Sequence, residues 1–209
     1  MDYVAIQGYL EQLVPPRPPE LAAMERYAAE HDFPIIGPVA GQLCYQTARL
    51  IGAQSVYELG SGYGYSTAWF ARAVQEAGGG DVHHVVWDEA LSAMARRHLA
   101  ALGYGDIVRY HVGEAVAALR ATDGPFDVIF MDIDKQGYPD ALEVIDARLR
   151  PGGVLIVDNV LWSGKIADDN AGDPTTAAIR RMNDTLARDA RYVTTIAPVR
   201  DGVLIAQKK

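Results

Sequence analysis

Residues 56–67 read VYELGSGYGYST, and the rest of the chain is best interpreted outward from this stretch. It begins as a short apolar run, typical of a buried strand, and continues through Gly60, Gly62 and Gly64 into a helical pattern. A glycine has no Cβ, so the backbone can turn sharply and approach a ligand closely. A strand, a glycine turn and a helix N-terminus together predict a nucleotide-binding corner. The turn alone does not indicate which nucleotide binds there.

The composition is that of an ordinary globular protein, with 209 residues, 49% of them hydrophobic and 22% charged. This length suits one domain. The formal net charge of −8 disfavours nucleic acid and membrane partners, because both attract basic surfaces. Cys44 is the single cysteine, which excludes an intrachain disulfide. The sequence shows no signal-peptide pattern and no apolar run near ~20 residues, so we expect a cytoplasmic protein.

Strand and helix patterns alternate after the glycine turn. We expect strands at residues 55–59, 83–87, 107–112, 126–131, 154–158, 192–197 and 202–207. The intervening helices are expected at residues 65–75, 91–102, after 114, 139–149 and 175–188. The strand runs are continuously apolar, as in strands that are covered on both faces, and predict a doubly wound, mostly parallel α/β sheet. The connection between the last two strands is too short for a parallel crossover and predicts an antiparallel hairpin.

Three further helices are expected before the first strand, at residues 1–14, 20–31 and 39–51. The proline-rich stretch 15–19 ends the first of them, because proline cannot continue a helix. These helices could cover an active site or build a dimer surface. We therefore expect one domain over residues 1–209, with N-terminal helices over 1–51 and the α/β core over 52–209.

Polar side chains collect where the predicted parallel strands end, which is where such sheets bind ligands. Asp132 follows one strand, and Asp158 and Asn159 stand at the end of the next. Together they supply two carboxylates and an amide oxygen, which suit Mg²⁺, Ca²⁺ or Mn²⁺. The alternative for either aspartate is that it caps the following helix or turn. We favour a metal site for the three residues together.

Other side chains near these strand ends are candidates for catalysis or binding. Lys135 lies three residues after Asp132; a nearby divalent cation would disfavour its ammonium form and allow it to act as a general base, the alternative being a surface lysine. Glu58 lies in an apolar stretch and needs partners, either the backbone N–H groups of the glycine loop or a ligand's ammonium group. Tyr138 and Trp162 are candidates for the wall of a planar acceptor's pocket, with packing as the alternative.

Four motifs together resemble one family. They are ELG-x₃-GYST at residues 58–67, DIDK-x₂-Y at 132–138, DNVLWSG at 158–164 and DG at 201–202. This combination is similar to the cation-dependent class I O-methyltransferases, the catechol and caffeoyl-CoA O-methyltransferase-like enzymes with their bacterial members. The likeness runs from about Pro34 to the C-terminus. The second and third motifs are specific, whereas the glycine turn would fit any class I methyltransferase.

The resemblance implies a Rossmann-like class I methyltransferase fold with a seven-stranded sheet, and transfer of a methyl group from S-adenosylmethionine to a hydroxyl of a small catechol-like or vicinal-diol acceptor. It also implies a divalent cation, usually Mg²⁺, and a homodimer. By position, Asp132, Asp158 and Asn159 resemble the metal ligands, and Lys135 resembles the base. The expected cofactor contacts are Glu58, Gly60, Gly62, Gly64, Ser66, Trp87, Asp88, Gly113, Glu114, Ala115 and Asp132.

One position departs from the family pattern. The family ends its second strand with an acidic residue that holds the ribose hydroxyls, two positions before an Asp. Here that position is Val86, which cannot accept a hydrogen bond, with Trp87 and Asp88 following. We hypothesise that Trp87 stacks on the adenine and that Asp88 partly replaces the missing acid; Glu89 is the other candidate.

Three other functions remain as alternatives. The same chemistry could act on a hydroxylated tRNA base, although the net charge of −8 and the lack of an evident basic cluster disfavour it. A non-catalytic, cofactor-binding homologue is left open by Val86, while the presence of Lys135 beside three metal-ligand types argues against it. A nicotinamide-dependent dehydrogenase is disfavoured because the acid after the second strand is missing.

Overall fold

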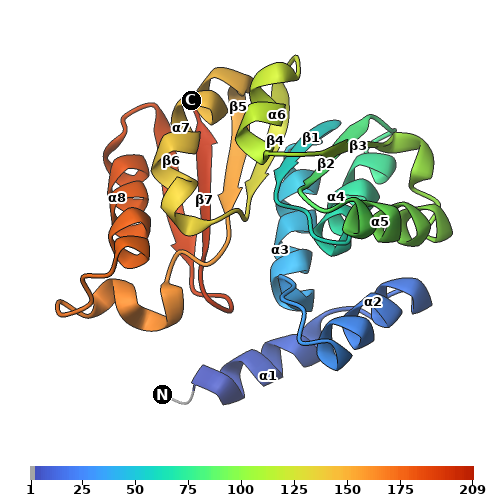
Figure 1. Cartoon of the computed structure of the whole chain (residues 1–209), viewed down its shortest axis with the longest axis horizontal. Coiled ribbons are helices and arrows are strands. Elements are labelled where there is room, and N and C mark those ends of the chain that lie inside the picture. The colour runs from blue at the N-terminus through green and yellow to red at the C-terminus, as the bar shows by residue number, and fades with distance from the viewer. Residues whose placement is uncertain (1–2) are drawn as a thin grey trace.

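A computed structural model describes residues 3–209 as a seven-stranded sheet with helices on both faces (Figure 1). The strands are β1 (Ser55–Leu59), β2 (Asp81–Val86), β3 (Val108–Val112), β4 (Phe126–Met131), β5 (Leu149–Val157), β6 (Tyr192–Ala197) and β7 (Val203–Lys208). Their order across the sheet is β3-β2-β1-β4-β5-β7-β6. The first five strands pair in parallel and β7 is antiparallel to both neighbours, which confirms the predicted fold and its C-terminal hairpin.

The helices alternate with the strands after β1, and three helices precede it. They are α1 (Tyr3–Leu13), α2 (Pro19–Glu30), α3 (Gly37–Leu50), α4 (Tyr65–Glu76), α5 (Glu89–Ala101), α6 (Ala115–Ala121), α7 (Tyr138–Arg148) and α8 (Pro174–Arg188). Short 3₁₀ segments are η1 (Gly105–Ile107), η2 (Lys135–Gly137) and η3 (Trp162–Ala167). Residues 1 and 2 of the first predicted helix lie outside the described part of the chain.

The sheet separates two apolar cores, which explains why its strands are apolar on both faces. Val56 of β1 and Val128 of β4 pack with side chains from α2 to α5. Their neighbours Tyr57 and Ile129 point to the opposite face and pack with side chains from α6 to α8. Side chains alternate across a strand, so each central strand contributes to both cores.

The structure corrects one boundary inside the sheet. The sequence predicts a strand only from residue 154, but β5 already begins at Leu149. Its pairing with β4 moves from Phe126–Leu149 to Val128–Val154, so the residues between them form an irregularity within the strand. Proline has no N–H to donate to the ladder of a sheet, and glycine has no side chain to pack on it. Both residues therefore occur at β-bulges as well as in turns.

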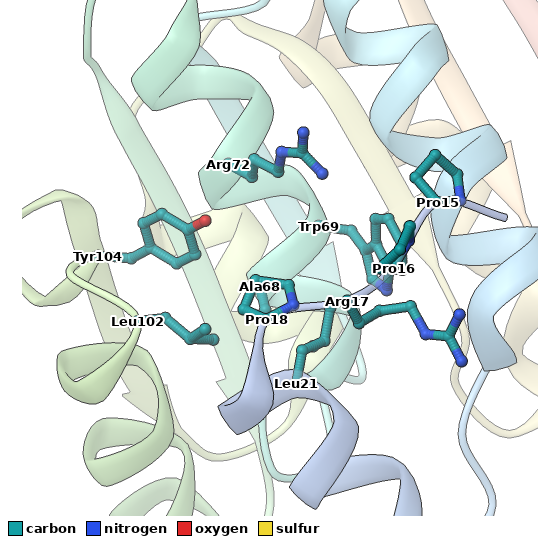
Figure 2. A pocket seen from close by; sticks show the side chains of 10 residues that line it. All are labelled: Pro15, Pro16, Arg17, Pro18, Leu21, Ala68, Trp69, Arg72, Leu102 and Tyr104. Atoms are coloured by element: carbon teal, nitrogen blue, oxygen red, sulfur yellow. The ribbon is translucent and has the colours of Figure 1, made fainter.

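The linker between α1 and α2 packs against α4. Pro15, Pro16 and Pro18 line one pocket with Trp69; Figure 2 shows Pro15 and Pro16 near that indole, Pro18 near Ala68 and Leu21, and Arg17 extending away. The Arg17 guanidinium pairs with Glu25, with Nε 2.9 Å from Oε1. Proline residues lose little entropy on ordering, so this short segment can hold α2 firmly against the core.

Polar contacts join α1 to the turn between β6 and β7, although no side chain of α1 is buried. The Tyr3 hydroxyl lies 2.6 Å from the carbonyl oxygen of Pro198 and 2.7 Å from that of Arg200. Oε1 of Gln7 accepts a hydrogen bond of 3.1 Å from the Arg200 backbone N–H. In Figure 1, α1 and α2 cross the end of the sheet from which η3 emerges. Within residues 3–209, no helix combines the length and apolar character needed to cross a membrane.

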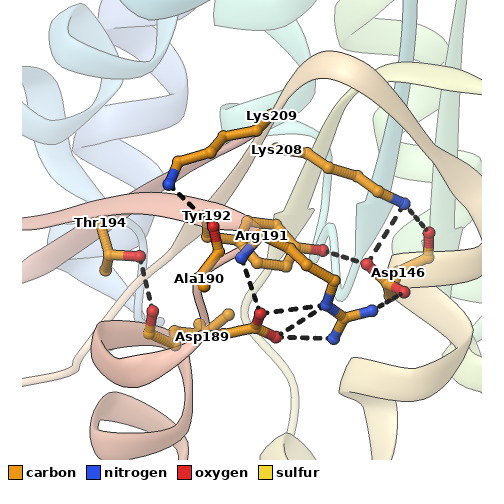
Figure 3. Close-up of polar contacts among 9 residues, drawn as sticks. Asp146, Asp189, Ala190, Arg191, Tyr192, Thr194, Lys208 and Lys209 are labelled. Atoms are coloured by element: carbon orange, nitrogen blue, oxygen red, sulfur yellow. Dashed lines mark hydrogen bonds and ion pairs between the residues drawn. The ribbon is translucent and has the colours of Figure 1, made fainter.

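Asp146 of α7 ties that helix to the two last strands (Figure 3). Its carboxylate accepts a hydrogen bond of 2.8 Å from the Tyr192 hydroxyl. It also forms ion pairs with Arg191, at 2.6 Å, and Lys208, at 3.2 Å. This carboxylate therefore holds the outermost strand β6 and its neighbour β7 against the helical layer.

Replacing Asp146 by Asn should lower the free energy of unfolding by about 1–2 kcal/mol, because the charge-assisted hydrogen bond from Tyr192 and the ion pairs with Arg191 and Lys208 weaken together. Urea unfolding measures this change. Asp184→Asn is the matched control: its ion pair with Arg188 is exposed on both sides, so the expected change is within about 0.5 kcal/mol. Equal effects of the two substitutions would contradict the structural role of Asp146.

Candidate active site

The glycine loop touches the end of β4 directly. Gly60 has φ +86°, and a Cβ at this position would lie 2.3 Å from the carbonyl oxygen of Asp132. The Asp132 backbone N–H donates a hydrogen bond of 2.8 Å to the Leu59 carbonyl oxygen. Ser61 fixes the other side of the loop, since its N–H donates to Val85 and its Oγ accepts from the Val85 N–H. The loop is thus held between β2 and β4.

A buried polar cluster lies beneath this loop. Thr67 Oγ1 donates a short hydrogen bond to Oε2 of Glu58. Thr67 Oγ1 also lies 3.0 Å from Nδ1 of His84. A hydroxyl has one proton, so while Thr67 donates to ionised Glu58, His84 can bond to Thr67 only as a donor through Nδ1–H. Burial lowers the pKa of His84 to about 3, which keeps its ring neutral. His84 was not among the predicted site residues, and nothing in its local sequence pattern distinguishes it from a strand residue.

Burial also raises the pKa of the Glu58 carboxyl to about 7, while hydrogen bonds from Ser66, Thr67 and Ser61 act in the opposite direction. The predicted need of Glu58 for partners is met at Oε2 by Thr67 of α4, whereas Oε1 is buried and has no hydrogen-bond partner among the described residues. A buried acid that titrates near neutral pH is characteristic of functional sites.

The four residues predicted for metal binding and catalysis line one cavity, which we call the central cavity. Its volume is about 290 Å³. Its lining residues are Phe33, Pro34, Ile35, Gly60, Gly62, Asp132, Lys135, Asp158, Asn159 and Arg200. The carboxyl ends of β4 and β5 and the glycine loop after β1 thus meet in one place, together with the turns before α3 and β7.

Opposite charges are paired within the central cavity. Lys135 Nζ lies 2.5 Å from Oδ1 of Asp132, and Arg200 Nη1 lies 3.3 Å from Oδ2 of Asp158. The Asp158 side chain is only 2% exposed. Burial, and next the negative charge of Asp132, raise the pKa of the Asp158 carboxyl to about 6. Arg200 was not predicted as a site residue.

The donor set of the central cavity fits a hard divalent cation. Residues 3–209 contain no group of three or more His, Cys, Asp and Glu side chains arranged for a metal. The donor set of this cavity is different: it consists of the carboxylates of Asp132 and Asp158 and the amide of Asn159. Water and substrate oxygens can complete the coordination shell of a cation bound by these three residues. Oδ1 of Asp158 is buried and has no hydrogen-bond partner among the described residues. A buried carboxylate oxygen without a donor calls for a cation.

A larger opening, the outer cavity, adjoins the central one through Asn159 and Arg200. It has a volume of about 800 Å³. Its other lining residues are Tyr3, Leu161, Ser163, Gly164, Ile166, Ala167 and Asp201. Backbone hydrogen bonds from Val160 and Leu161 to Gly202 and Asp201 join the two loops that form its wall.

A third opening, the side cavity, contains three of the predicted cofactor residues: Trp87, Glu114 and Ala115. Its volume is about 340 Å³, and Trp87 is 70% exposed. The Glu114 carboxylate accepts hydrogen bonds from the N–H groups of Val116 and Ala117 and so caps α6. An exposed indole beside a cavity is free to stack on a ligand.

Asp88 and Gly113 lie next to the side cavity without lining it. Oδ1 of Asp88 accepts a hydrogen bond of 2.9 Å from the Leu91 N–H and caps α5. Gly113 donates its N–H to the Val86 carbonyl oxygen. The proposed contact of Asp88 with a ribose stays a prediction, and it would have to use the oxygen that does not cap the helix.

The structure places the two predicted acceptor-wall residues elsewhere. Tyr138 is fully buried, and its hydroxyl donates a hydrogen bond of 3.0 Å to the Asp158 carbonyl oxygen. Lys135 Nζ lies 5.2 Å from the centre of the Tyr138 ring. Trp162 packs against the same core as Tyr138. Neither residue is among those that line the central or the outer cavity. Tyr138 instead contacts the loops that carry Lys135 and Asp158, whereas a role for Trp162 in the acceptor pocket stays a prediction.

The chain belongs to the O-methyltransferase family, whose model matches residues 19–209. Among curated relatives, it is 30% identical over 200 residues to a catechol O-methyltransferase from Niastella koreensis, covering 93% of this chain and 90% of that protein. The prediction of an S-adenosylmethionine-dependent O-methyltransferase is thereby confirmed at the level of the family.

Solved structures agree with this assignment. The O-methyltransferase TomG from Streptomyces achromogenes, involved in tomaymycin synthesis and solved with SAM, matches with a TM-score of 0.87 at 27% identity, covering 100% of this chain and 99% of TomG. An O-methyltransferase from Bacillus cereus, solved with SAH, matches with a TM-score of 0.87 at 29% identity, covering 98% of this chain and 97% of that one. The class I methyltransferase fold predicted from the sequence is therefore confirmed.

Gly60→Ala should destabilise the protein by at least about 2 kcal/mol, because a left-handed alanine is strained and its Cβ would overlap the Asp132 carbonyl. Chemical denaturation gives the value. Gly172→Ala provides the control, since a Cβ there meets no atom within 4 Å. A Gly60→Ala protein as stable as the control would show that the loop and β4 do not touch.

Stability should depend on pH through Glu58. Its carboxyl keeps a proton in the folded state up to pH about 7, whereas the unfolded chain releases it near 4.5. The folded state therefore binds more protons in this interval, and stability falls as pH rises from about 4.5 to 7. Glu58→Gln removes this effect, so the variant should gain on the order of 3 kcal/mol relative to wild type between pH 4.5 and 7.5. Denaturation curves at both pH values test this, and a constant difference would contradict it.

Proposed function

We propose that the protein transfers a methyl group from S-adenosylmethionine to a hydroxyl of a small acceptor with two adjacent oxygens, and that a divalent cation bound by Asp132, Asp158 and Asn159 assists the reaction. The observation that carries the proposal is the central cavity, where these residues and Lys135 lie beside the glycine loop. The sequence similarity to a catechol O-methyltransferase supports an acceptor of this kind.

The cofactor would be held by the glycine loop and by residues of the side cavity. Gly60, Gly62 and Ser66 line a crevice that shares residues with the central cavity. Ionised Glu58 would either hold the loop or accept a hydrogen bond from the cofactor's ammonium group, and the exposed Trp87 would stack on the adenine. S-adenosylmethionine supplies a methyl group on a positively charged sulfur.

The central cavity would ionise the acceptor and hold it. A divalent cation on the two carboxylates and the amide favours the ionised form of an acceptor hydroxyl. Lys135 would take the proton at Nζ, from a position fixed by Asp132 at 2.5 Å and by the Tyr138 ring. Orientation of the resulting oxyanion toward the methyl group would supply much of the rate, since methyl transfer requires alignment more than acid–base power.

The outer cavity would receive the body of the acceptor. Leu161, Ile166 and Ala167 give it an apolar wall, and Asn159 and Arg200 connect it to the central cavity. Apolar walls with a few convergent polar groups are typical of sites for small molecules. Regiochemistry would follow from how the acceptor body lies against this wall.

A homodimer and a cytoplasmic location stay predictions for this chain. The helix α1 exposes apolar side chains, among them Val4, Tyr9 and Leu13. We propose that a second copy covers them, in keeping with the homodimer that the family resemblance implies.

Methyl transfer from S-adenosylmethionine to a panel of catechols should require Mg²⁺ and stop with EDTA, because the metal donors of the central cavity would lose their cation. Lys135→Met should lower kcat by about 100-fold or more, as expected for loss of a general base. Lys165→Met is the matched control, since that lysine side chain is exposed and lines neither cavity.

Transfer that survives EDTA would overturn the metal assignment while leaving the family assignment intact. Equal activity of the Lys135→Met and Lys165→Met proteins would remove Lys135 from the proton transfer. Product analysis by mass spectrometry distinguishes methylation of a hydroxyl from methylation elsewhere on the acceptor.

A further inference from the structure

Arg200 is held in an unfavourable backbone conformation that directs it into the active site. Its φ is +50°, in the left-handed region that costs a residue with a side chain about 1 kcal/mol or more. Its N–H donates to Gln7, and its carbonyl accepts from Tyr3, so α1 holds the residue from both sides. Such strain persists only where the surroundings fix it, and it is concentrated at functional sites.

The guanidinium of Arg200 is the nearest cation to Asp158. Nη1 lies 3.3 Å from Oδ2 of a carboxylate that is almost fully buried, while the Arg200 side chain itself remains 36% exposed. Lys135 pairs with Asp132 in the same way, so each of the two acidic side chains in the central cavity faces one basic side chain.

A metal on Asp158 would stand within a few ångströms of this guanidinium. Repulsion between like charges at that distance is weakly screened in a partly buried site. We propose that Arg200 is a built-in counter-cation that competes with the divalent metal for Asp158 and so sets the metal affinity of the site. This inference rests on the metal site of the proposed function.

The geometry provides a route for the exchange. Arg200 lines both the central and the outer cavity, so its guanidinium can leave Asp158 without crossing the protein interior. Oδ1 of Asp158 is buried and has no hydrogen-bond partner among the described residues, so the guanidinium at Oδ2 leaves this second oxygen unused. Entry of the metal and departure of the guanidinium keep that carboxylate paired with a cation throughout, which avoids an unpaired buried charge.

Titration of the full-length protein with Mn²⁺, followed by the EPR signal of free Mn²⁺, tests this proposal without an acceptor or turnover. Arg200→Gly and Arg200→Asn both suit a left-handed backbone and remove the charge. Each should bind Mn²⁺ at least about tenfold more tightly than wild type, whereas Arg200→Lys should stay within about threefold of it. Arg188→Gln removes a remote, exposed charge as the control, with an expected change under about twofold.

Asp158→Asn separates the two levels of inference. If Asp158→Asn weakens Mn²⁺ binding and the two neutral Arg200 variants bind like wild type, the metal site stands and the counter-cation is overturned. If wild type and all Arg200 variants fail to bind Mn²⁺ at millimolar concentration, the metal part of the proposed function is overturned as well. Tighter binding by both neutral variants, with no gain in Arg188→Gln, supports the proposal.

Discussion

The close approach of Gly60 to the Asp132 carbonyl is the constraint on which the site depends. It brings the loop after β1 against the end of β4, at the point where the strand order of the sheet reverses. Ligands of doubly wound sheets bind at such a point, because the helices on either side diverge there. One backbone contact thus brings the glycine loop and the carboxylate of Asp132 together, and a side chain at Gly60 would separate them.

The electrostatics of the site follow from burial. Acidic groups that lose water need a cation or hydrogen-bond donors, and the structure meets this need differently in two neighbouring places. Glu58 lies beside hydroxyl donors and the neutral His84, and burial favours its protonated form although the hydroxyl hydrogen bonds favour the ionised one. Asp132 and Asp158 instead face Lys135 and Arg200. The first arrangement is closed, whereas the second opens onto cavities that a ligand can enter.

Much of this could be predicted from sequence, because strand ends in a parallel sheet converge and Asp132, Lys135 and Asp158 follow strands. Arg200 could not be predicted as a site residue. Its position depends on the turn between β6 and β7 returning to the same edge of the sheet and on contacts with α1, and no local sequence pattern encodes either. The motif Asp201-Gly202, which follows Arg200 in the sequence, was the available sequence signal that this turn belongs to the site. The sequence leaves Tyr138 open between a cavity wall and packing, because an aromatic residue in a core and one in a pocket have the same local pattern.

The contact between Tyr3 and Arg200 joins residues 197 positions apart. Such a contact can form only after the intervening chain has been synthesised. The cofactor corner needs only β1, β2 and β4, whereas β5 keeps an open hydrogen-bonding edge until β7, the last strand to be synthesised, fills the gap between β5 and β6. Open strand edges attract other chains, so β5 is exposed to incorrect pairing until β7 lies beside it. The side of the sheet that carries Arg200 is therefore completed after the strands that hold the glycine loop.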